Sequence, residues 1–312
     1  MKILVTGAAG FLGSNLVQRL VTEGNDVVGV DNLLTGKLHN LDKCILATNF
    51  TFYDADIIKL AEDLKPGFQQ IYHLASPASP PKYMQHEYET MMVNTLATEK
   101  LARYCMSNNA RLLFSSTSEV YGDPLVNPQS ETYFGNVNPI GPRSIYDESK
   151  RFGETLIAHF NRTQQLDSII IRIFNTYGPG MDPYDGRVVT NFIRQMLMGE
   201  PVTIYGDGSQ TRSFCYVDDL ITGMILAMNS SQIGPINLGN PNEFTLTTLV
   251  KIIASKIGVE PQLKFEQLPT DDPKVRRPDI ANARALLGWE PEIQLEVGID
   301  KTLQWIRTAI EA

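Results

Sequence analysis

Short apolar runs alternate with helical stripes along the first 174 residues of the chain. Ile3–Val5 is a continuous apolar run, which is typical of a parallel strand that is covered on both faces. Leu12, Leu16 and Leu20 then recur at helical spacing. Further apolar runs predict buried strands at 27–30, 71–75, 112–114 and 168–174. The alternation predicts an α/β fold built around a parallel sheet.

The pattern changes after Phe174, where apolar segments become shorter and glycine and proline become more frequent. We therefore predict a first domain over residues 1–174 and a smaller α/β domain, which binds the substrate, over residues 175–312. Segments near 216–240 are regular enough to return to the first domain, so the boundary is expected to be interleaved. A chain of 312 residues suffices for one large α/β unit or two packed domains.

Three glycines follow the first predicted strand. Gly7, Gly10 and Gly13 stand between strand and helix, the order that a dinucleotide pyrophosphate requires, because the N–H groups of the turn and of the helix N-terminus face its charge. Asp31 ends the next strand, where a carboxylate accepts hydrogen bonds from the adenosine ribose and repels a 2′-phosphate. NAD is therefore favoured over NADP. The alternative for Asp31 is a solvated loop acid.

Two later stretches are candidates to complete the cofactor site. Asp56 could reach the adenine amino group at the edge of the sheet, and its alternative is an N-cap for the segment that follows. Residues 76–81 form a proline-dense loop, which is rigid and poor at donating hydrogen bonds. This loop is either a fixed wall beside the cofactor or a plain connection.

A run of small hydroxyl residues follows Leu112–Phe114. It predicts that this strand opens into a site, since ligands bind at the carboxyl edge of parallel sheets. Tyr146 and Lys150 stand four apart at the start of a predicted helix, so both side chains point from one face. A phenol has a pKa of about 10, and a nearby ammonium would stabilise its phenolate. The alternative for this pair is an exposed helix face.

Composition narrows the classes of function. The formal net charge of −8 argues against a nucleic-acid surface, which calls for clustered Lys and Arg. Cys44, Cys105 and Cys215 lie far apart without metal-ligand spacing, so we expect free thiols in a reducing compartment and no metal. The first residues predict a strand rather than a signal peptide, and no apolar run is long enough to span a bilayer. We expect a cytoplasmic protein that binds no membrane.

Several longer strings extend these motifs. They are SEVYGDP at Ser118–Pro124, GNVNPIGPR at Gly135–Arg143, DGRVV at Asp185–Val189, GSQTR at Gly208–Arg212 and RPD at Arg277–Asp279. Together with Gly-x-x-Gly-x-x-Gly and Tyr-x-x-x-Lys, they resemble the extended short-chain dehydrogenase/reductases and, within these, the UDP-glucuronate decarboxylases. The resemblance runs from Met1 to about Ile306. It implies a Rossmann-type doubly wound domain, bound NAD, conversion of UDP-glucuronic acid to UDP-xylose, and a homodimer built on helices of the first domain.

The resemblance also implies roles for residues of the site. Tyr146 phenolate would take the proton of the sugar 4-hydroxyl while hydride leaves C4 for the nicotinamide. Lys150 would hold the cofactor ribose and keep the phenol's pKa low, and Thr117 would hydrogen-bond the phenol oxygen. Carbon dioxide would leave the 4-keto intermediate, and hydride would return to C4. Glu119 would handle a proton or water at C5, and its alternative is a salt-bridged carboxylate. The other cofactor contacts would be Gly7, Gly10, Phe11, Leu12, Gly13, Asp31, Asn32, Asp56, Ile57, Leu74 and Ser76.

Arginines are expected to hold the anionic substrate. Arg276 would meet its carboxylate, or supply the enolate's proton through water, because a guanidinium gives planar, bidentate recognition. Arg277 could take that role instead. Arg187 and Arg212 would neutralise the diphosphate, and the alternative for Arg187 is a surface salt bridge. The remaining substrate contacts would be Asn175, Val188, Tyr205 and Gln210.

Three rival functions are weighed against this one. A sugar 4,6-dehydratase has Asp-Glu where this chain has Ser118-Glu119, because it protonates a departing 6-hydroxyl and a serine cannot. A 4-epimerase needs no carboxylate beside its hydroxyl residue. A non-catalytic nucleotide-sugar or NAD-binding protein would be expected to lose the phenol, the lysine or the acid, and all three are present. Two positions depart from the family pattern: Ser149 replaces a Gly, and Met92 replaces a Lys expected near the sugar pocket.

Overall fold

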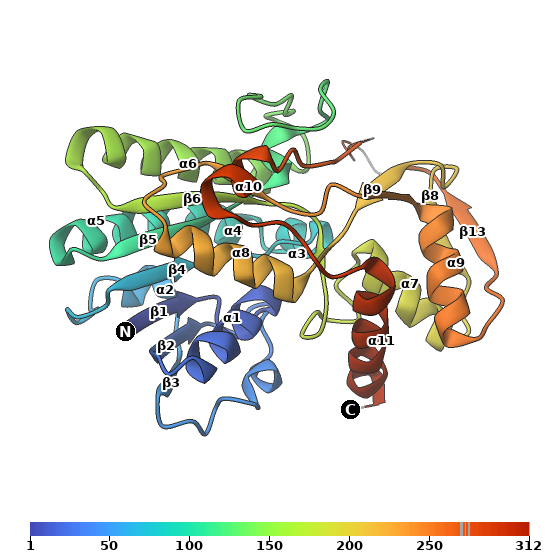
Figure 1. Cartoon of the computed structure of the whole chain (residues 1–312), viewed down its shortest axis with the longest axis horizontal. Coiled ribbons are helices and arrows are strands. Elements are labelled where there is room, and N and C mark those ends of the chain that lie inside the picture. The colour runs from blue at the N-terminus through green and yellow to red at the C-terminus, as the bar shows by residue number, and fades with distance from the viewer. Residues whose placement is uncertain (269–270, 272, 274, 312) are drawn as a thin grey trace.

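Figure 1 shows the computed structural model of the chain, which describes residues 1–268, 271, 273 and 275–311. Seven strands, all parallel, form the central sheet in the order β11-β6-β5-β4-β1-β2-β3. Their bounds are β1 Lys2–Thr6, β2 Asp26–Asp31, β3 Phe50–Asp54, β4 Gln70–His73, β5 Arg111–Thr117, β6 Ser168–Ile173 and β11 Ile236–Leu238. The predicted α/β fold around a doubly wound parallel sheet is confirmed.

Helices cover both faces of this sheet, which is why its strands are continuous apolar runs. Successive side chains of a strand point to opposite faces, so Ile3 and Val5 join one core cluster and Leu4 joins the other. Helices α1 and α8 pack together in the first cluster, and α5 and α6 in the second (Figure 1). The helices of this part are α1 Phe11–Thr22, α2 Ile57–Leu60, α3 Pro80–Gln85, α4 Glu87–Met92, α5 Thr98–Asn108, α6 Ser144–Gln164 and α8 Val217–Asn229, with a π-helical turn at Val93–Ala97 and 3₁₀ turns at Leu38–Leu41 and Ser118–Tyr121.

The rest of the described chain adds three two-stranded sheets beside the carboxyl edge of the central one. β7 pairs with β10 and β8 with β13 in parallel, whereas β9 and β12 are antiparallel. The core cluster that holds Ile3 continues into this part through Phe192, Leu249 and Ile299, so both parts share one core. The elements are β7 Thr176–Tyr177, α7 Val188–Leu197, β8 Val202–Tyr205, β9 Thr211–Ser213, β10 Cys215–Tyr216, β12 Glu243–Thr245, α9 Leu246–Ile257, β13 Leu263–Glu266, α10 Ala281–Leu287 and α11 Leu295–Glu311.

Strand β11 returns to the central sheet late in the sequence and pairs with β6. Its Asn237 is buried; the side-chain oxygen accepts the Tyr121 hydroxyl at 2.8 Å, and the amide donates to the carbonyl oxygens of Gln129 and Asp279 at 3.0 Å each. One side chain thus joins the edge of the sheet to two distant loops.

Two further observations bear on the predictions from composition. Cys44, Cys105 and Cys215 are buried free thiols, as predicted. Within the described ranges, none of the helices combines the length and the apolar character that a membrane span requires.

Candidate active site

The glycine turn between β1 and α1 leaves no room for side chains. Gly7 has a φ of +72°, and a Cβ there would lie 2.8 Å from the backbone of Leu74 and of Ala75. A Cβ on Gly13 would lie 1.9 Å from the carbonyl oxygen of Gly7. Glycine at these two positions lets the turn pack directly against the chain after β4 and against the start of α1. The amides of residues 7–10 are bonded within the protein, so the N–H groups at the N-terminus of α1 are the ones that can meet a phosphate group.

A cavity of about 360 Å³ lies beside this turn. The Asp31 carboxylate accepts the amides of Ala9 at 3.0 Å and Leu33 at 2.9 Å, and burial raises its pKa. Asp56 accepts the amide of Ile58 at 2.9 Å as the N-cap of α2, so its alternative role coexists with a place in the lining. The predicted cofactor residues that line this smaller cavity are Gly7, Gly10, Asp31, Asn32, Asp56, Ile57, Leu74 and Ser76.

A larger cavity of about 640 Å³ lies at the carboxyl ends of β5 and β6. Leu74 and Ser76 line both cavities, so the two spaces adjoin there. Phe11 and Leu12, from the first turn of α1, line the larger one, whereas Gly13 lines neither and contributes through packing. The close glycine turn, the acid at the end of β2 and the adjoining cavities fit an extended dinucleotide such as NAD.

Tyr146 and Lys150 reach the larger cavity from the start of α6, and both are buried. The exposed helix face that was the alternative for this pair is therefore wrong. The Lys150 ammonium donates to the carbonyl oxygen of Ser115 at 2.7 Å and lies 5.8 Å from the centre of the Tyr146 ring. Burial lowers the pKa of Lys150 to about 7.

The predicted effect of Lys150 on the phenol stays a prediction. Burial raises the pKa of Tyr146 above its ordinary value, and the largest opposing effect is a hydrogen bond with Thr117. The Lys150 ammonium is bound to the carbonyl of Ser115, and burial disfavours its positive charge. The predicted pairing of Thr117 with the phenol agrees with this arrangement.

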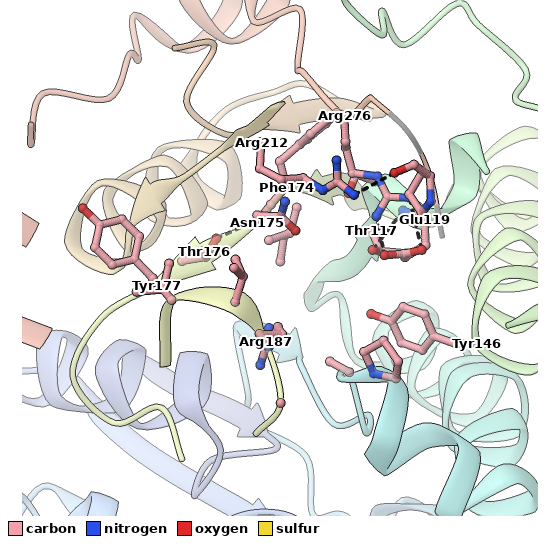
Figure 2. Close-up of a pocket in the computed structure, with 18 of the residues that line it drawn as sticks. Thr117, Glu119, Tyr146, Phe174, Asn175, Thr176, Tyr177, Arg187, Arg212 and Arg276 are labelled. Atoms are coloured by element: carbon pink, nitrogen blue, oxygen red, sulfur yellow. Dashed lines mark hydrogen bonds and ion pairs between the residues drawn. The ribbon is translucent and has the colours of Figure 1, made fainter. Parts of the chain in front are cut away.

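Glu119 is held by two arginines on the other side of the cavity from Arg187 (Figure 2). Arg143 donates to one carboxylate oxygen at 2.7 Å, and Arg276 binds both oxygens. Burial alone would raise the pKa of Glu119, but Arg276 and Arg143 outweigh it and lower the pKa to about 2. The salt-bridged carboxylate that was its alternative is thus present, in a residue that also lines the cavity.

The structure distinguishes the two candidate arginines near the C-terminal part. Arg276 is 4% exposed and lines the larger cavity. The Arg277 side chain is 41% exposed, lies 3.6 Å from Glu243 and is outside that lining. The geometry therefore favours Arg276. Its predicted contact with a substrate carboxylate stays a prediction, because the guanidinium here binds Glu119.

Arginines and polar groups line the part of the larger cavity away from the cofactor turn. Arg187 precedes α7 and pairs with Asp185, yet faces the cavity (Figure 2). Arg212 donates to the carbonyl oxygens of Thr211 at 2.9 Å and Pro273 at 2.8 Å. This concentration of guanidinium groups suits an anionic ligand. The predicted substrate residues in the lining are Asn175, Arg187, Val188, Tyr205, Gln210, Arg212 and Arg276.

Sequence reasoning missed three residues around Tyr146 and misplaced a fourth. Arg143 ends the GNVNPIGPR string, and a lone charge in so specific a string was a usable signal. Tyr83 stacks flat on Tyr146, with ring centres 5.0 Å apart and planes 3° apart, and Asp147 is buried beside it; neither carried a signal. Met92, expected near the sugar pocket, lines the smaller cavity instead, because α4 passes along the cofactor side.

Comparisons relate this chain to several known proteins. A sequence model described as "NAD dependent epimerase/dehydratase family" matches residues 3–239. UDP-glucuronic acid decarboxylase 1 of Xenopus tropicalis is 46% identical over 310 residues, which span 99% of this chain and 73% of the relative. UDP-glucuronic acid decarboxylase 6 of Arabidopsis thaliana is 48% identical over 300 residues, spanning 96% and 87%. The crystal structure of UDP-glucuronic acid 4-epimerase from Bacillus cereus, in complex with UDP-glucuronic acid and NAD, superposes with a TM-score of 0.87 at 31% identity over 99% of both chains.

Proposed function

Because this chain belongs to the NAD dependent epimerase/dehydratase family, we propose that it converts UDP-glucuronic acid to UDP-xylose and carbon dioxide. The observation that carries the proposal is the carboxylate of Glu119, bound by Arg276, in one cavity with Tyr146 and Ser118. A hydroxyl-expelling enzyme would need an acid at position 118. The relatives named UDP-glucuronic acid decarboxylase, at 46% and 48% identity, support this reaction over that of the epimerase, at 31%.

The glycine turn and the smaller cavity would hold NAD. The first amides of α1 would face the pyrophosphate, and Asp31 would accept hydrogen bonds from the adenosine ribose and disfavour the 2′-phosphate of NADP. Asp56, which also lines the smaller cavity, would contact the adenine. When bound, NAD would accept hydride from C4 of the sugar and return it within the same turnover.

Tyr146 would act as the general base. It would take the proton of the 4-hydroxyl during oxidation and give it back to the same oxygen at the end, so its own proton balance is zero. For this step the phenol must start as phenolate, whose oxygen Thr117 would stabilise by hydrogen bonding and the nearby Lys150 ammonium by its charge. The flat stack with Tyr83 fixes the plane of the ring.

Oxidation at C4 would turn the substrate into a β-keto acid. The bond between C5 and C6 then breaks, its electron pair enters the C4 carbonyl to form an enolate, and C6 leaves as carbon dioxide. C5 takes up a proton afterwards. Because a carboxylate is replaced by hydrogen, each turnover consumes one proton from outside the substrate.

Arg276 and Glu119 would serve this second stage. Arg276 would draw the C6 carboxylate into the cavity by bidentate recognition, and Glu119 would direct a proton or water to C5. Arg187 and Arg212 would neutralise the diphosphate, with Asn175 on a phosphate and Tyr205 on the uridine. These roles are supported by the shared lining of the larger cavity.

A product assay tests the proposed function. Purified protein supplied with UDP-glucuronic acid and NAD should release carbon dioxide and yield UDP-xylose, as followed by mass spectrometry. Recovery of unchanged substrate, or of only a 4-epimer, would contradict the proposal. A panel of UDP- and dTDP-sugars without a C6 carboxylate is the matched control, and none of them should release carbon dioxide.

A homodimer in the cytoplasm is the proposed setting of this activity. Phe152 on α6 is 51% exposed, so an apolar side chain stands on the outer face of the first part of the chain. A second copy of the same helices would cover it. Sedimentation should give about twice the mass of one chain, and a Phe152→Glu variant should sediment as a monomer.

A further inference from the structure

A second buried acid lies beside Glu119 and has no part in the reaction as described so far. Asp147 follows Tyr146 in α6 and is 5% exposed. Its Oδ1 atom is buried and has no hydrogen-bond partner among the described residues. An unpaired carboxylate in such a place is costly, whereas a protonated carboxyl is tolerated. A buried acid with an unpartnered oxygen at this position is therefore a candidate for a functional role.

The surroundings of Asp147 connect it to Glu119. Arg143 lies one turn earlier, and its carbonyl oxygen accepts the Asp147 amide at 3.1 Å, so the two side chains project from the same helix face. The guanidinium of Arg143 binds Glu119 at 2.7 Å, and Arg276 binds Glu119 from the other side. The charged groups that act on Asp147 are Glu119 and Glu148, which repel its negative form, and Arg143 and Arg276, which favour it.

The two acids differ in charge at neutral pH. Both guanidinium groups hold Glu119, which keeps the pKa of that carboxyl near 2. Asp147 has no such ion pair within the described part of the chain. Burial and repulsion by Glu119 raise its pKa to about 8 in spite of Arg143 and Arg276. At neutral pH the raised pKa favours the protonated form of Asp147, whereas Glu119 is ionised.

The Tyr83 hydroxyl belongs to the same cluster. Tyr83 is 1% exposed, its hydroxyl has no partner among the described residues, and Arg143, Glu119 and Asp147 all act on it electrostatically. A tyrosine hydroxyl can donate and accept at once. Buried polar atoms without protein partners are the usual contacts of internal water. Oδ1 of Asp147 and the Tyr83 hydroxyl are two such contacts within the cluster that includes Glu119.

We propose that Asp147 is a positioning residue that stores the proton consumed in decarboxylation and passes it, by way of Glu119, to C5 of the enolate. This inference rests on the proposed function. Glu119, which is ionised at rest, takes the proton of Asp147 through the Tyr83 hydroxyl and water and delivers it to C5. There the C5–H bond forms with the electron pair left by the departing carbon dioxide, and solvent then reprotonates Asp147. No oxidant or reductant is needed in this step.

The test compares Asp147→Asn with Glu148→Gln in the complete enzyme with NAD and UDP-glucuronic acid. Glu148 is the next residue of the same helix, 41% exposed, and pairs only loosely with Arg151 at 3.6 Å, so its variant controls for loss of a charge. We expect Asp147→Asn to lower kcat by roughly 100-fold, the low end of the contribution of a proton-transfer group, with KM within about twofold. Oxidation at C4 should still proceed, so reduced cofactor should accumulate during turnover, as followed by its absorbance.

The pH profile is a readout that a merely structural role would not move. Because Asp147 is protonated below a pH of about 8, kcat of the parent should fall as the pH rises through that value. The Asp147→Asn profile should be flat there, whereas that of Glu148→Gln should keep the fall, moved to lower pH because Glu148 no longer repels the charged form of Asp147. Tyr83→Phe, which keeps the ring stack, should lower kcat several-fold and also accumulate reduced cofactor.

Thermal unfolding supplies a readout without turnover. Asp147 has a folded pKa above its ordinary value of 3.8, so its burial costs nothing at lower pH and costs progressively more as the pH rises from about 4 to about 8. The Tm of Asp147→Asn relative to the parent should therefore rise over that window.

Two results would overturn the inference, and a third would contradict the proposed function. A kcat and pH profile of Asp147→Asn equal to those of Glu148→Gln would overturn the inference. If Asp147→Asn does not fold, Tyr83→Phe with parental kcat and no accumulated reduced cofactor would overturn it as well. Failure of the parent itself to release carbon dioxide would contradict the proposed function instead, so the two failures are distinguishable.

Discussion

The two cavities of this molecule are built on opposite principles. The smaller one depends on positions without side chains: a Cβ at Gly13 would lie 1.9 Å from a backbone oxygen. At the turn, a ligand meets backbone amides rather than charged side chains. The larger one depends on side chains that are present and ionised, with Glu119 between Arg143 and Arg276. Backbone geometry is encoded within a few neighbouring residues, whereas a buried charge cluster needs partners from distant parts of the chain.

This difference has an energetic counterpart. Amides in a turn are satisfied by a phosphate or by water at little cost. A buried carboxylate is tolerated only with its cations in place, because an uncompensated charge in the interior costs several kcal/mol. The cofactor side should therefore tolerate changes of charge and be sensitive to added volume. The catalytic side should tolerate added volume better than changes of charge. Three substitutions test this contrast, from the largest expected effect to the smallest.

Tyr146→Phe should have the largest effect. It keeps the ring and its stack with Tyr83 and removes only the hydroxyl, so oxidation at C4 should fall by about 10²- to 10⁴-fold, the usual contribution of a general base. NAD binding should stay nearly unchanged. Release of carbon dioxide and formation of reduced cofactor measure the oxidation, and titration calorimetry measures NAD binding. Tyr53→Phe, at a 50% exposed position on β3, is the control and should behave like the parent; turnover of Tyr146→Phe within about threefold of the parent would remove the phenol from its role.

Arg276→Met should destabilise the fold as well as slow the reaction. Removing one partner of a buried ion pair costs about 3–5 kcal/mol, and Arg143 places the expected loss near the lower value. Arg277→Met, at a half-exposed pair, should cost no more than about 1 kcal/mol. Denaturant unfolding measures both, and equal losses would show that Glu119 does not need its second arginine.

The pH dependence of the stability loss in Arg276→Met follows from the ionisation of Glu119. Its folded pKa of about 2 lies below the ordinary 4.5, so its stabilising effect is present above a pH of about 4.5 and is lost as the pH falls toward 2. The deficit of Arg276→Met should accordingly be largest above that window and shrink within it. A deficit that stays constant down to pH 2 would contradict the assignment.

Gly13→Ala should destabilise the fold by about 1–3 kcal/mol, the usual cost of an added methyl group in a packed place. It should nevertheless weaken NAD binding, because the turn must move away from α1 to admit the Cβ. Gly199→Ala is the control: its φ of +69° is strained for alanine, but a Cβ there meets nothing within 4 Å, so NAD affinity should not change. Equal NAD affinity in both variants would mean that the fit of the turn is not what binds the cofactor.

The same contrast explains how much was predictable. Some features depend on neighbouring residues alone and were predictable: the strands, the glycine turn, Asp31, and the spacing of Tyr146 and Lys150. The structure has the strands in the predicted sheet and these residues at the two cavities. The partners of Glu119 come from positions 143 and 276, and periodicity does not relate such distant residues. The burial of Lys150 and its bond to the carbonyl of Ser115 are likewise set by tertiary packing, which sequence spacing does not show.

The late return of β11 has a consequence for attempts to exchange parts between such proteins. A fragment that stops at residue 174 would leave one margin of the sheet unpaired and would lack Asn237, on which Tyr121 and two loops converge. Exposed margins of this kind recruit other chains. Grafting a foreign C-terminal part onto this scaffold should therefore succeed only if the graft carries its own version of residues 217–238. The two parts of the chain are interlocked and cannot be exchanged as independent halves.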